Sequence, residues 1–238
     1  MENHTTSIQV KNSFDITQPL TEDLCEFLGA FSGDGFTNVY NGCKYFVGFS
    51  GDTRHDLRYY QDIIMPIAKR LFNIQNPYVR IGRKNAMWVT FYSKLLHQML
   101  INRFQMPTGV KFDKVRVPKE VLEAAPEMKA AFIRGCMDTD GCVFFDKRPT
   151  YKTNYMRLDL CMYNPVILDE IKEMLSGLGI LSQRLANNKH LQITSKENVR
   201  KYLAIIGSSN RRHINKILKK YPDFEEWNPI GNYRFLFR

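Results

Sequence analysis

The chain has 238 residues, of which 44% are hydrophobic and 24% charged, as in an ordinary globular protein. Its 34 Lys and Arg against 24 Asp and Glu leave a net charge of +10, so we expect a polyanionic partner. No apolar run approaches the roughly 20 residues of a spanning helix, and no strongly basic amphipathic helix has an aromatic face. Membrane lipid is therefore the weaker candidate, and we expect a nucleic-acid partner and no membrane partner.

The cysteines and the N-terminus bear on where the protein works. The five cysteines form no C-x-x-C pair, and their odd number argues against a disulfide framework, so we expect reduced core thiols. The segment MENHTTSIQVKNSFDITQP has neither the basic nor the apolar region of a secretory signal. We expect an intracellular protein that is not secreted, in the cytoplasm or nucleoid of a prokaryote or in an organelle matrix.

The first half of the chain alternates helix and strand patterns. It predicts a helix, two strands, a helix, two strands and a helix, over residues 22–33, 36–40, 44–50, 54–72, 77–83, 86–92 and 94–104. Gly35 is expected to cap the first helix. Asn41-Gly42 is a typical hairpin turn, and Thr53 with Asp56 indicates a capping box for the second helix.

The second half repeats this order after a proline-containing linker, in which a short helix is expected after Pro118. The same seven elements are predicted over residues 127–139, 142–147, 155–163, 165–178, 181–186, 190–194 and 196–206. Residues 207–238 lie beyond this pattern. They predict a basic helix over 211–220 and an aromatic tail that packs back on the domain.

An internal repeat accounts for the matching order of elements. FLGAFSGDG (27–35) aligns with IRGCMDTDG (133–141) at an offset of 106, and VTFYSK (89–94) resembles LQITSK (191–196) at an offset of 102. We therefore predict an α+β fold of two pseudo-symmetric αββαββα halves. The expected domains are an N-terminal half with a polar arm, a linker and a C-terminal half with an extension, at residues 1–106 (arm 1–19), 107–125 and 126–238.

The glycines in the repeated helices predict a close helix–helix contact. Each interior helical glycine costs about 1 kcal/mol against alanine, so a compensating interaction is expected. Gly29, Gly33 and Gly135 leave nearly bare stripes through which the two helix backbones can approach each other. We expect these three glycines to form the interface between the halves.

The acids that end the two helices point to a metal site. If the helices run parallel, Asp34 and Asp140 meet where two helix C-termini already carry partial negative charge. Two close carboxylates demand a cation or a raised pKa. Oxygen ligands without nearby His or Cys suit Mg²⁺, which binds through one or two carboxylates plus substrate phosphates. Acids, Mg²⁺ and a basic chain together indicate phosphodiester hydrolysis.

Two simpler roles for these motifs fit the residues less well. A single GDG after an apolar helix is usually only a turn, but its repetition favours a function. DTDG does not fit a calcium loop, because counting from Asp138 the glycine falls at position 4 and Cys142 at position 5. Asp138 has Ser32 rather than an acid as its counterpart, so we interpret it as structural.

Polar strand faces suggest how nucleic acid would bind. In the strand 155–163, Met156, Leu158, Leu160 and Met162 alternate with polar residues, which predicts one core face and one solvated face. A solvated face alone would account for any one such strand, but several in a basic chain favour readout of the DNA major groove. The candidate nucleic-acid contacts are Arg80, Arg83, Lys84, Lys147, Arg148, Arg157, Arg184, His190 and Gln192.

On the paired nonapeptides FLGAFSGDG and IRGCMDTDG, the chain resembles the LAGLIDADG homing endonucleases, in their single-chain form with two motifs. The resemblance covers about residues 20–206. It implies a monomeric nuclease, encoded in an intron or intein, that binds a long asymmetric double-stranded DNA site in a saddle of antiparallel strands and cuts both strands. It implies two or three Mg²⁺ ions shared with DNA phosphates, with Mn²⁺ as a substitute. Asp34 and Asp140 match the catalytic metal-binding acids, and Gly33 and Thr139 match positions whose backbone carbonyls assist.

The chain departs from the family at several basic positions. Where many members carry Lys or Gln at the end of the second strand of each half, this chain has Ser50-Gly51 and Met162-Tyr163, and Val143 also replaces a basic residue of some relatives. Lys94 and Lys196, which the repeat pairs, could replace these missing basic residues only weakly. They fit solvated residues in the first turns of surface helices at least as well.

Two alternative functions would use the same scaffold. An RNA maturase would bind intron RNA without cutting DNA. A transcriptional regulator would ordinarily show degraded acids or an added helix-turn-helix, and the sequence has neither.

Overall fold

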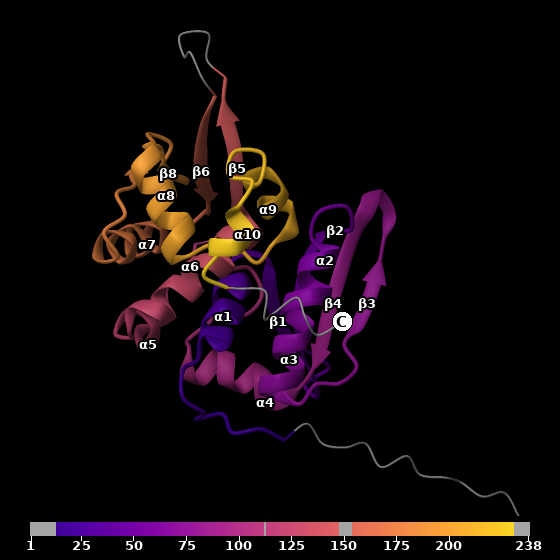
Figure 1. Cartoon of the computed structure of the whole chain (residues 1–238). Coiled ribbons are helices and arrows are strands. Elements are labelled where there is room, and N and C mark those ends of the chain that lie inside the picture. Colours follow the sequence, from indigo (N-terminus) through magenta and orange to yellow (C-terminus); the bar gives the residue numbers. More distant parts are fainter. Residues whose placement is uncertain (1–12, 112, 148–153, 231–238) are drawn as a thin grey trace, which may run out of the picture.

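The computed structural model describes residues 13–111, 113–147 and 154–230. Two mixed α/β halves lie on either side of a central pair of helices, α1 (Glu22–Asp34) and α6 (Pro126–Asp140), which pack side by side (Figure 1). Across these ranges, none of the helices has both the length and the apolar character needed to cross a membrane.

The N-terminal half follows the predicted order with short π-helical segments added. After α1 it contains β1 (Gly35–Tyr40), β2 (Lys44–Asp52), α2 (Leu57–Tyr59), the π-helix η1 (Tyr60–Ile64), α3 (Met65–Phe72), β3 (Tyr78–Ile81), the 3₁₀ turn η2 (Arg83–Asn85), β4 (Ala86–Tyr92), α4 (Lys94–Gln98) and the π-helix η3 (Met99–Arg103). Asn41 and Gly42 have φ angles of 50° and 68°, which confirms the tight turn between β1 and β2.

The C-terminal half repeats this arrangement and adds an extension. Its elements are α5 (Lys119–Leu122) in the segment between the halves, then α6, β5 (Gly141–Asp146), β6 (Tyr155–Cys161), α7 (Pro165–Gly177), β7 (Gln183–Arg184), β8 (His190–Ile193), α8 (Lys196–Ile205), α9 (Arg211–Ile217) and α10 (Phe224–Trp227). The short helix after Pro118 is confirmed.

The two sheets have the same topology. One is ordered β1-β2-β4-β3 and the other β5-β6-β8-β7, and all pairs are antiparallel. The predicted α+β fold of two pseudo-symmetric halves is therefore confirmed. The alternation in β6 also holds, because Met156, Leu158 and Leu160 are buried while Arg157 and Asp159 lie on the opposite face.

Glycines bring the central helices into backbone contact. A Cβ built on Gly29 would lie 2.0 Å from the carbonyl oxygen of Phe132, and one on Gly135 would lie 2.2 Å from that of Glu26. Gly135 and Phe132 follow Gly29 and Glu26 by 106 residues, so the same contact occurs twice about a pseudo-twofold axis. Only glycine fits at either position.

A buried ion pair also joins the two helices. Arg134 Nε donates to Glu26 Oε2 over 2.8 Å, and both side chains are almost completely buried. Arg134 Nη1 also donates to the carbonyl oxygen of Ile206. Because a buried charge is tolerated only with a partner, this pair helps to fix the register of α6 on α1.

The C-terminal extension is tied to α6 through Asp138. The Asp138 carboxylate accepts hydrogen bonds from Ser208 Oγ at 2.5 Å, Ser209 N at 2.7 Å and Asn210 N at 3.2 Å. His213 Nδ1 lies 3.3 Å from the same carboxylate. Asp138 is thus a buried structural residue that holds the segment leading into α9.

The capping box predicted from Thr53 and Asp56 is wrong. The helical region begins at Leu57, and Asp56 caps no amide of that helix. Its carboxylate instead accepts from the Asp52 amide at 2.8 Å and faces Arg212 at 3.4 Å. Because these partners compete for the carboxylate, the helix starts three residues later than expected.

Other expectations need smaller corrections. β7 has two residues rather than six, the helix over 94–104 continues as π-helix from Met99, and α9 ends at Ile217. All five cysteines are free, but only Cys25 and Cys136 lie in the core, whereas the other three are exposed. Residues 1–12 of the polar arm and 231–238 of the aromatic tail lie outside the described ranges.

Candidate active site

The two motif acids end adjacent helices at one place. Asp34 and Asp140 are the last residues of α1 and α6, and both line a pocket of about 580 Å³. A Cβ on Gly33 would lie 2.2 Å from Thr139 Oγ1 and 3.2 Å from Asp140 Oδ2. Gly33 therefore leaves the space in which the second acid sits beside the first helix.

Burial of these acids raises their pKa values. Burial and the neighbouring Asp140 raise the pKa of Asp34 from 3.8 to about 7, although a hydrogen bond from Tyr60 opposes the rise. Burial raises the pKa of Asp140 to about 6, against the lowering effect of Lys111 and Arg212. Without added positive charge, the pair therefore favours retaining a proton near neutral pH.

Tyr60 orients the first acid. Its hydroxyl lies 2.8 Å from both Asp34 Oδ2 and the carbonyl oxygen of Ser50, so one proton serves two acceptors. Tyr60 begins the π-helix η1, and π-helical turns occur often at functional sites. Burial and the Asp34 charge raise the pKa of Tyr60 well above its usual value, so it stays protonated.

Lys111 brings a cation from the segment between the halves to the end of α1. Its Nζ donates to three successive backbone carbonyl oxygens, those of Phe31, Ser32 and Gly33. These are among the carbonyls that a helix C-terminus leaves without internal partners. Lys111 also faces both acids, whose charges oppose the lowering of its own pKa to about 8 by burial.

Arg212 brings a second cation, from the C-terminal extension, to the end of α6. Its Nη2 donates to the carbonyl oxygen of Thr139 at 3.3 Å, and its Nη1 lies 3.4 Å from Asp56 Oδ1. The Asp56 contact reaches into the N-terminal half, so Arg212 bridges the two halves. Its charge helps to hold down the pKa of Asp140.

Sequence reasoning missed the roles of Lys111, Arg212 and Tyr60, although the repeat contained a signal for the first two. Lys111 and Arg212 are 101 residues apart, close to the offsets that relate the two copies. Each contacts the carbonyl that precedes its acid, at Gly33 or Thr139. Extending the repeat beyond residue 206 would have paired them. Tyr60 has no such counterpart.

Residues that stand where many LAGLIDADG proteins carry Lys or Gln, at the ends of the second strands, lie in the same pocket. Ser50, Met162 and Tyr163 all line it, and Lys189 lies over the Tyr163 ring with 4.4 Å between its Nζ and the ring centroid. Lys94 and Lys196 do not line the pocket; Lys94 lies over the ring of Tyr45. The cations at the acids therefore come from Lys111 and Arg212 and not from these two lysines.

The nucleic-acid candidates of the N-terminal half are exposed. Arg80 on β3 lies over the Trp88 ring at 5.4 Å from its centroid, which fixes the guanidinium on the open face of the sheet. Arg83 and Lys84 occupy the exposed turn η2, and Lys84 adopts a left-handed backbone with φ of 55°.

In the C-terminal half several candidates have protein partners. Arg157 pairs with Asp146 at 2.9 Å, and His190 Nδ1 lies 2.9 Å from Asp159 Oδ2. Arg184 donates to the carbonyl oxygens of Pro165, at the start of α7, and of Asn188, in the β7–β8 turn, and lies 3.4 Å from Asp169, so it braces α7 against this hairpin.

Three candidates remain. Gln192 lies half-buried on the outward face of β8, and Lys147 is exposed. Arg148 lies outside the described residues.

The donor set at the acids fits a hard divalent cation. It offers the carboxylates of Asp34 and Asp140 together with the carbonyl oxygens of Gly33 and Thr139, which already face cationic groups. No cluster of three or more His, Cys, Asp or Glu suited to a metal occurs in the described ranges. The site therefore suits Mg²⁺, which completes its shell with water and phosphate, better than a metal that requires a closed protein cage.

Comparison with known proteins agrees with this architecture. Residues 127–207 match the family model described as a LAGLIDADG-like domain. The mesophilic variants of the homing endonuclease I-DmoI superpose with a TM-score of 0.55 at 17% identity, over 79% of this chain and 97% of theirs. I-DmoI in complex with DNA and Mn gives 0.55 at 16% identity over 79% and 98%. I-WcaI bound to its DNA recognition sequence gives 0.50 at 13% identity over 93% and 89%.

Curated relatives match this chain over small parts of much larger proteins. The replication factor C small subunit of Methanocaldococcus jannaschii is 27% identical over 85% of this chain but only 10% of its own length. The same-named subunit of Thermococcus kodakarensis is 26% identical over 83% of this chain and 21% of its length. The ribonucleoside-diphosphate reductase NrdEB subunit alpha of Bacillus subtilis matches 34% of this chain and 7% of its own.

Two glycine-packed helices that end on acids, each leading into a four-stranded antiparallel sheet, define the single-chain LAGLIDADG class of fold. Residues 127–207 match the LAGLIDADG-like domain, and the chain as described has the fold of the single-chain homing endonucleases that superpose on it.

Proposed function

We propose that the chain is a site-specific homing endonuclease that makes divalent-metal-dependent double-strand breaks in a long asymmetric DNA target. The observation that carries the proposal is the meeting of Asp34 and Asp140 in one pocket, with Lys111 and Arg212 beside them. One acid from each half supplies one centre for each DNA strand, so a monomer suffices. The similar structures solved with target DNA and with Mn, Mg or Ca support this reaction class.

Different residues of this chain have different roles in the proposed hydrolysis. Asp34, Asp140 and the carbonyl oxygens of Gly33 and Thr139 would hold Mg²⁺, which supplies water activation and stabilisation of the leaving oxygen when bound. Tyr60 keeps Asp34 in one orientation. The cationic groups of Lys111 and Arg212 add positive charge where negative charge grows on the phosphate in the transition state.

The relatives also suggest where the gene resides. The chain resembles a small portion of two replication factor subunits and of a reductase subunit, and these relatives bear unrelated names. A self-contained unit inserted into different host genes would produce this distribution. We therefore propose that the protein is encoded within an intron or intein, and that its target is the host sequence with the insertion removed.

Substitution of the acids tests the proposed function. We expect Asp34→Asn and Asp140→Asn each to abolish double-strand cleavage in Mg²⁺ while DNA binding survives, because the charge is lost and the shape is kept. Linearisation of a supercoiled plasmid carrying the insertion-free site measures cleavage, and gel shift measures binding. Asp169→Asn, on the outer side of α7, is the matched control. Cutting at the wild-type rate by both acid variants would refute the assignment. So would a wild-type protein that leaves the DNA intact but assists splicing of its intron.

A further inference from the structure

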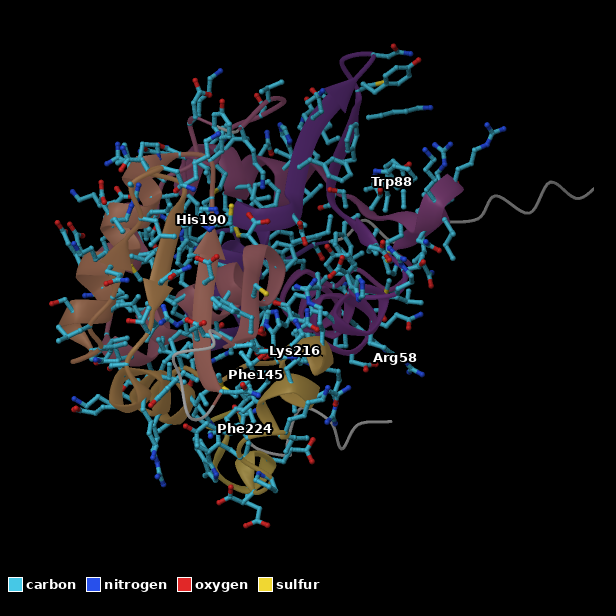
Figure 2. The ribbon with its side chains drawn as sticks, turned by 90° about the horizontal axis from the view of Figure 1, so that it is seen from above. Arg58, Trp88, Phe145, His190, Lys216 and Phe224 are labelled. Atoms are coloured by element: carbon cyan, nitrogen blue, oxygen red, sulfur yellow. The ribbon has the colours of Figure 1, made fainter. Side chains whose placement is uncertain are left out.

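The C-terminal extension forms a basic surface beside the active site. α9 packs on β5 at the edge of the C-terminal sheet, with Ile214 and Ile217 buried beneath it. Figure 2, seen from above, shows Lys216 of α9 next to Phe145 of β5. Because the loop before α9 is bonded to Asp138, the extension is a fixed part of this half.

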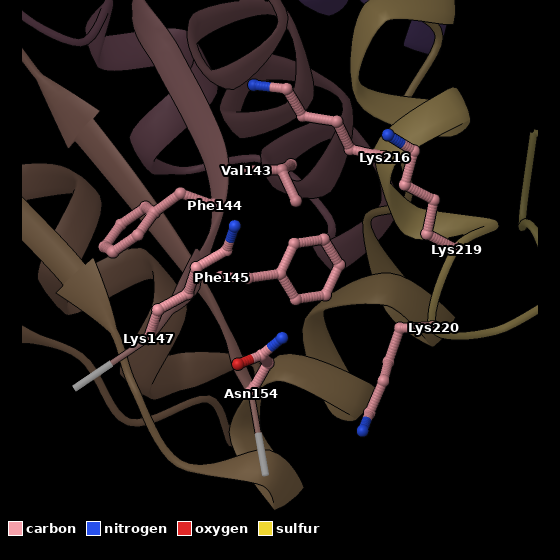
Figure 3. A pocket seen from close by; sticks show the side chains of 8 residues that line it. All are labelled: Val143, Phe144, Phe145, Lys147, Asn154, Lys216, Lys219 and Lys220. Atoms are coloured by element: carbon pink, nitrogen blue, oxygen red, sulfur yellow. The ribbon is translucent and has the colours of Figure 1, made fainter. Parts of the chain in front are cut away.

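An open hollow lies between α9 and β5. Its volume is about 620 Å³, and its lining residues are Val143, Phe144, Phe145, Lys147, Asn154, Lys216, Lys219 and Lys220. Figure 3 shows the lysines arranged around the ring of Phe145, while Phe144 points the other way, as strand alternation requires. A smaller hollow adjoins it, shares Asn154 and Lys220, and adds Lys196.

The charge of this surface is not balanced by nearby protein groups. Of the described residues that line the two hollows, none is acidic. In the described part of the chain, no carboxylate lies within ion-pair distance of Lys147, Lys216, Lys219 or Lys220. Gathered cations repel one another and attract a polyanion. Asn154 adds a neutral hydrogen-bonding group of the kind that contacts phosphate oxygens.

Arg212 connects the hollow to the acids through α9. Arg212, in the first turn of α9, contacts the carbonyl of Thr139 next to Asp140. Lys216 lies one turn further along, roughly 6 Å up the helix axis. Phosphates of one DNA strand follow each other about every 3.4 Å along the duplex axis. The axial distance from Arg212 to Lys216 therefore equals about two phosphate spacings.

We propose that this lysine-lined hollow binds the phosphodiester backbone of duplex DNA beside the cleavage position, in the half-site covered by the C-terminal sheet. The proposal rests on the proposed DNA-cleaving function and adds a contact surface outside the two strand saddles. Such contacts position DNA without reading its sequence, so they contribute equally to target and unrelated duplexes.

A charge-removal variant tests the surface. In the full chain, we expect Lys216→Gln/Lys219→Gln/Lys220→Gln to lower affinity for target and unrelated duplexes alike, about ten-fold or more at ~0.15 M salt. The slope of log K against log salt should fall by up to ~2.7, since each phosphate contact contributes about 0.9. Cleavage at saturating protein should be retained.

The control removes the same charge elsewhere. Lys69→Gln/Lys119→Gln/Lys172→Gln changes exposed lysines on α3, α5 and α7; α3 and α7 cover the core faces of the sheets, and α5 lies near the end of α6 remote from Asp140. Its salt slope should change by less than about one unit. If the triple variant melts earlier than wild type, the exposed pair Lys219→Gln/Lys220→Gln replaces it, with an expected slope change of up to ~1.8.

The outcomes separate this surface from the proposed function. A wild-type protein that cleaves, with a triple variant that keeps the wild-type slope, overturns the surface and leaves the function standing. In another outcome, the wild-type protein cuts no DNA while the triple variant still has a smaller salt slope than the control variant on unrelated duplex. That result supports the surface although the proposed function fails. Weakened binding of structured RNA with unchanged duplex binding overturns the DNA assignment.

Discussion

At the scale of single residues, Lys111 is the residue outside the motifs that contacts the end of α1 most extensively. Its ammonium group satisfies three carbonyls at the end of α1 and faces both acids. We expect Lys111→Met to lower the cleavage rate at least ten-fold and the free energy of unfolding by about 1.5–3 kcal/mol, the range for hydrogen bonds to charged groups. Single-turnover cleavage and urea denaturation measure the two effects.

Lys189 provides the control for this prediction. It lines the same pocket but is exposed, and its ammonium group lies over the ring of Tyr163. Lys189→Met removes the same charge from the pocket without exposing helix carbonyls, so its stability should change by less than about 1 kcal/mol. Equal stability losses in the two variants would show that Lys111 acts only as one surface charge among others.

The site residues that could be predicted lie inside the repeated motifs, and those that could not be predicted lie outside them. Asp34 and Asp140 could be predicted as a pair because each ends a repeated nonapeptide and each helix carries glycine at the contact. Lys111 and Arg212 lie in segments that follow the recognisable repeat, where spacing is looser. Tyr60 reaches Asp34 from a π-helical turn, a feature without a sequence pattern of its own. Tertiary proximity alone brings Tyr60 to the acids, whereas the looser part of the repeat relates Lys111 to Arg212.

At the scale of elements, the contact between α1 and α6 positions everything else. Alanine is the better helix former by about 1 kcal/mol, yet a Cβ at Gly29 would lie 2.0 Å from a backbone carbonyl of α6. Because backbone cannot move aside as a flexible side chain can, the helices must separate. We expect Gly29→Ala to lower the free energy of unfolding by roughly 1–3 kcal/mol and to weaken cleavage, measured by urea denaturation and plasmid linearisation.

Gly177 is the matched control for this substitution. It is the last residue of α7, and a Cβ there would meet nothing within 4 Å. Gly177→Ala should be neutral or stabilising by up to about 1 kcal/mol, with unchanged cleavage. If Gly29→Ala were as harmless as Gly177→Ala, the close contact between the motif helices would not exist in solution.

Elements could be predicted where local pattern and tertiary burial agree. The alternation in β6 and the Asn41-Gly42 turn belong to this group, because one residue type fits one backbone and one face. The start of the second helix was missed because Asp56 serves the Asp52 amide and Arg212, the latter 156 residues away along the chain. A capping motif read locally contains no information about such a distant competitor.

At the scale of the whole molecule, the fold holds two like charges together against their repulsion. The buried pair Glu26–Arg134 and the glycine contacts fix the helices, while Asp34 and Asp140 meet at their ends. Their folded pKa values of about 7 and about 6 exceed the usual 3.8, so the folded chain binds more protons than the unfolded chain in that interval. The contribution of this pair to stability must then fall as the pH rises between about 4 and 7.

This linkage gives a prediction for the metal-free protein. The double variant Asp34→Asn/Asp140→Asn lacks both titrations, so its advantage in unfolding free energy over wild type should grow from about pH 4 to pH 7 by at least ~1 kcal/mol. Urea denaturation in EDTA across this range measures the difference, from which the contributions of groups remote from the two acids cancel. Adding Mg²⁺ above pH 7 should then stabilise wild type and not the variant, because the ion binds the ionised folded pair. A difference that stays constant with pH would mean that folding does not raise the pKa values of these two carboxylates.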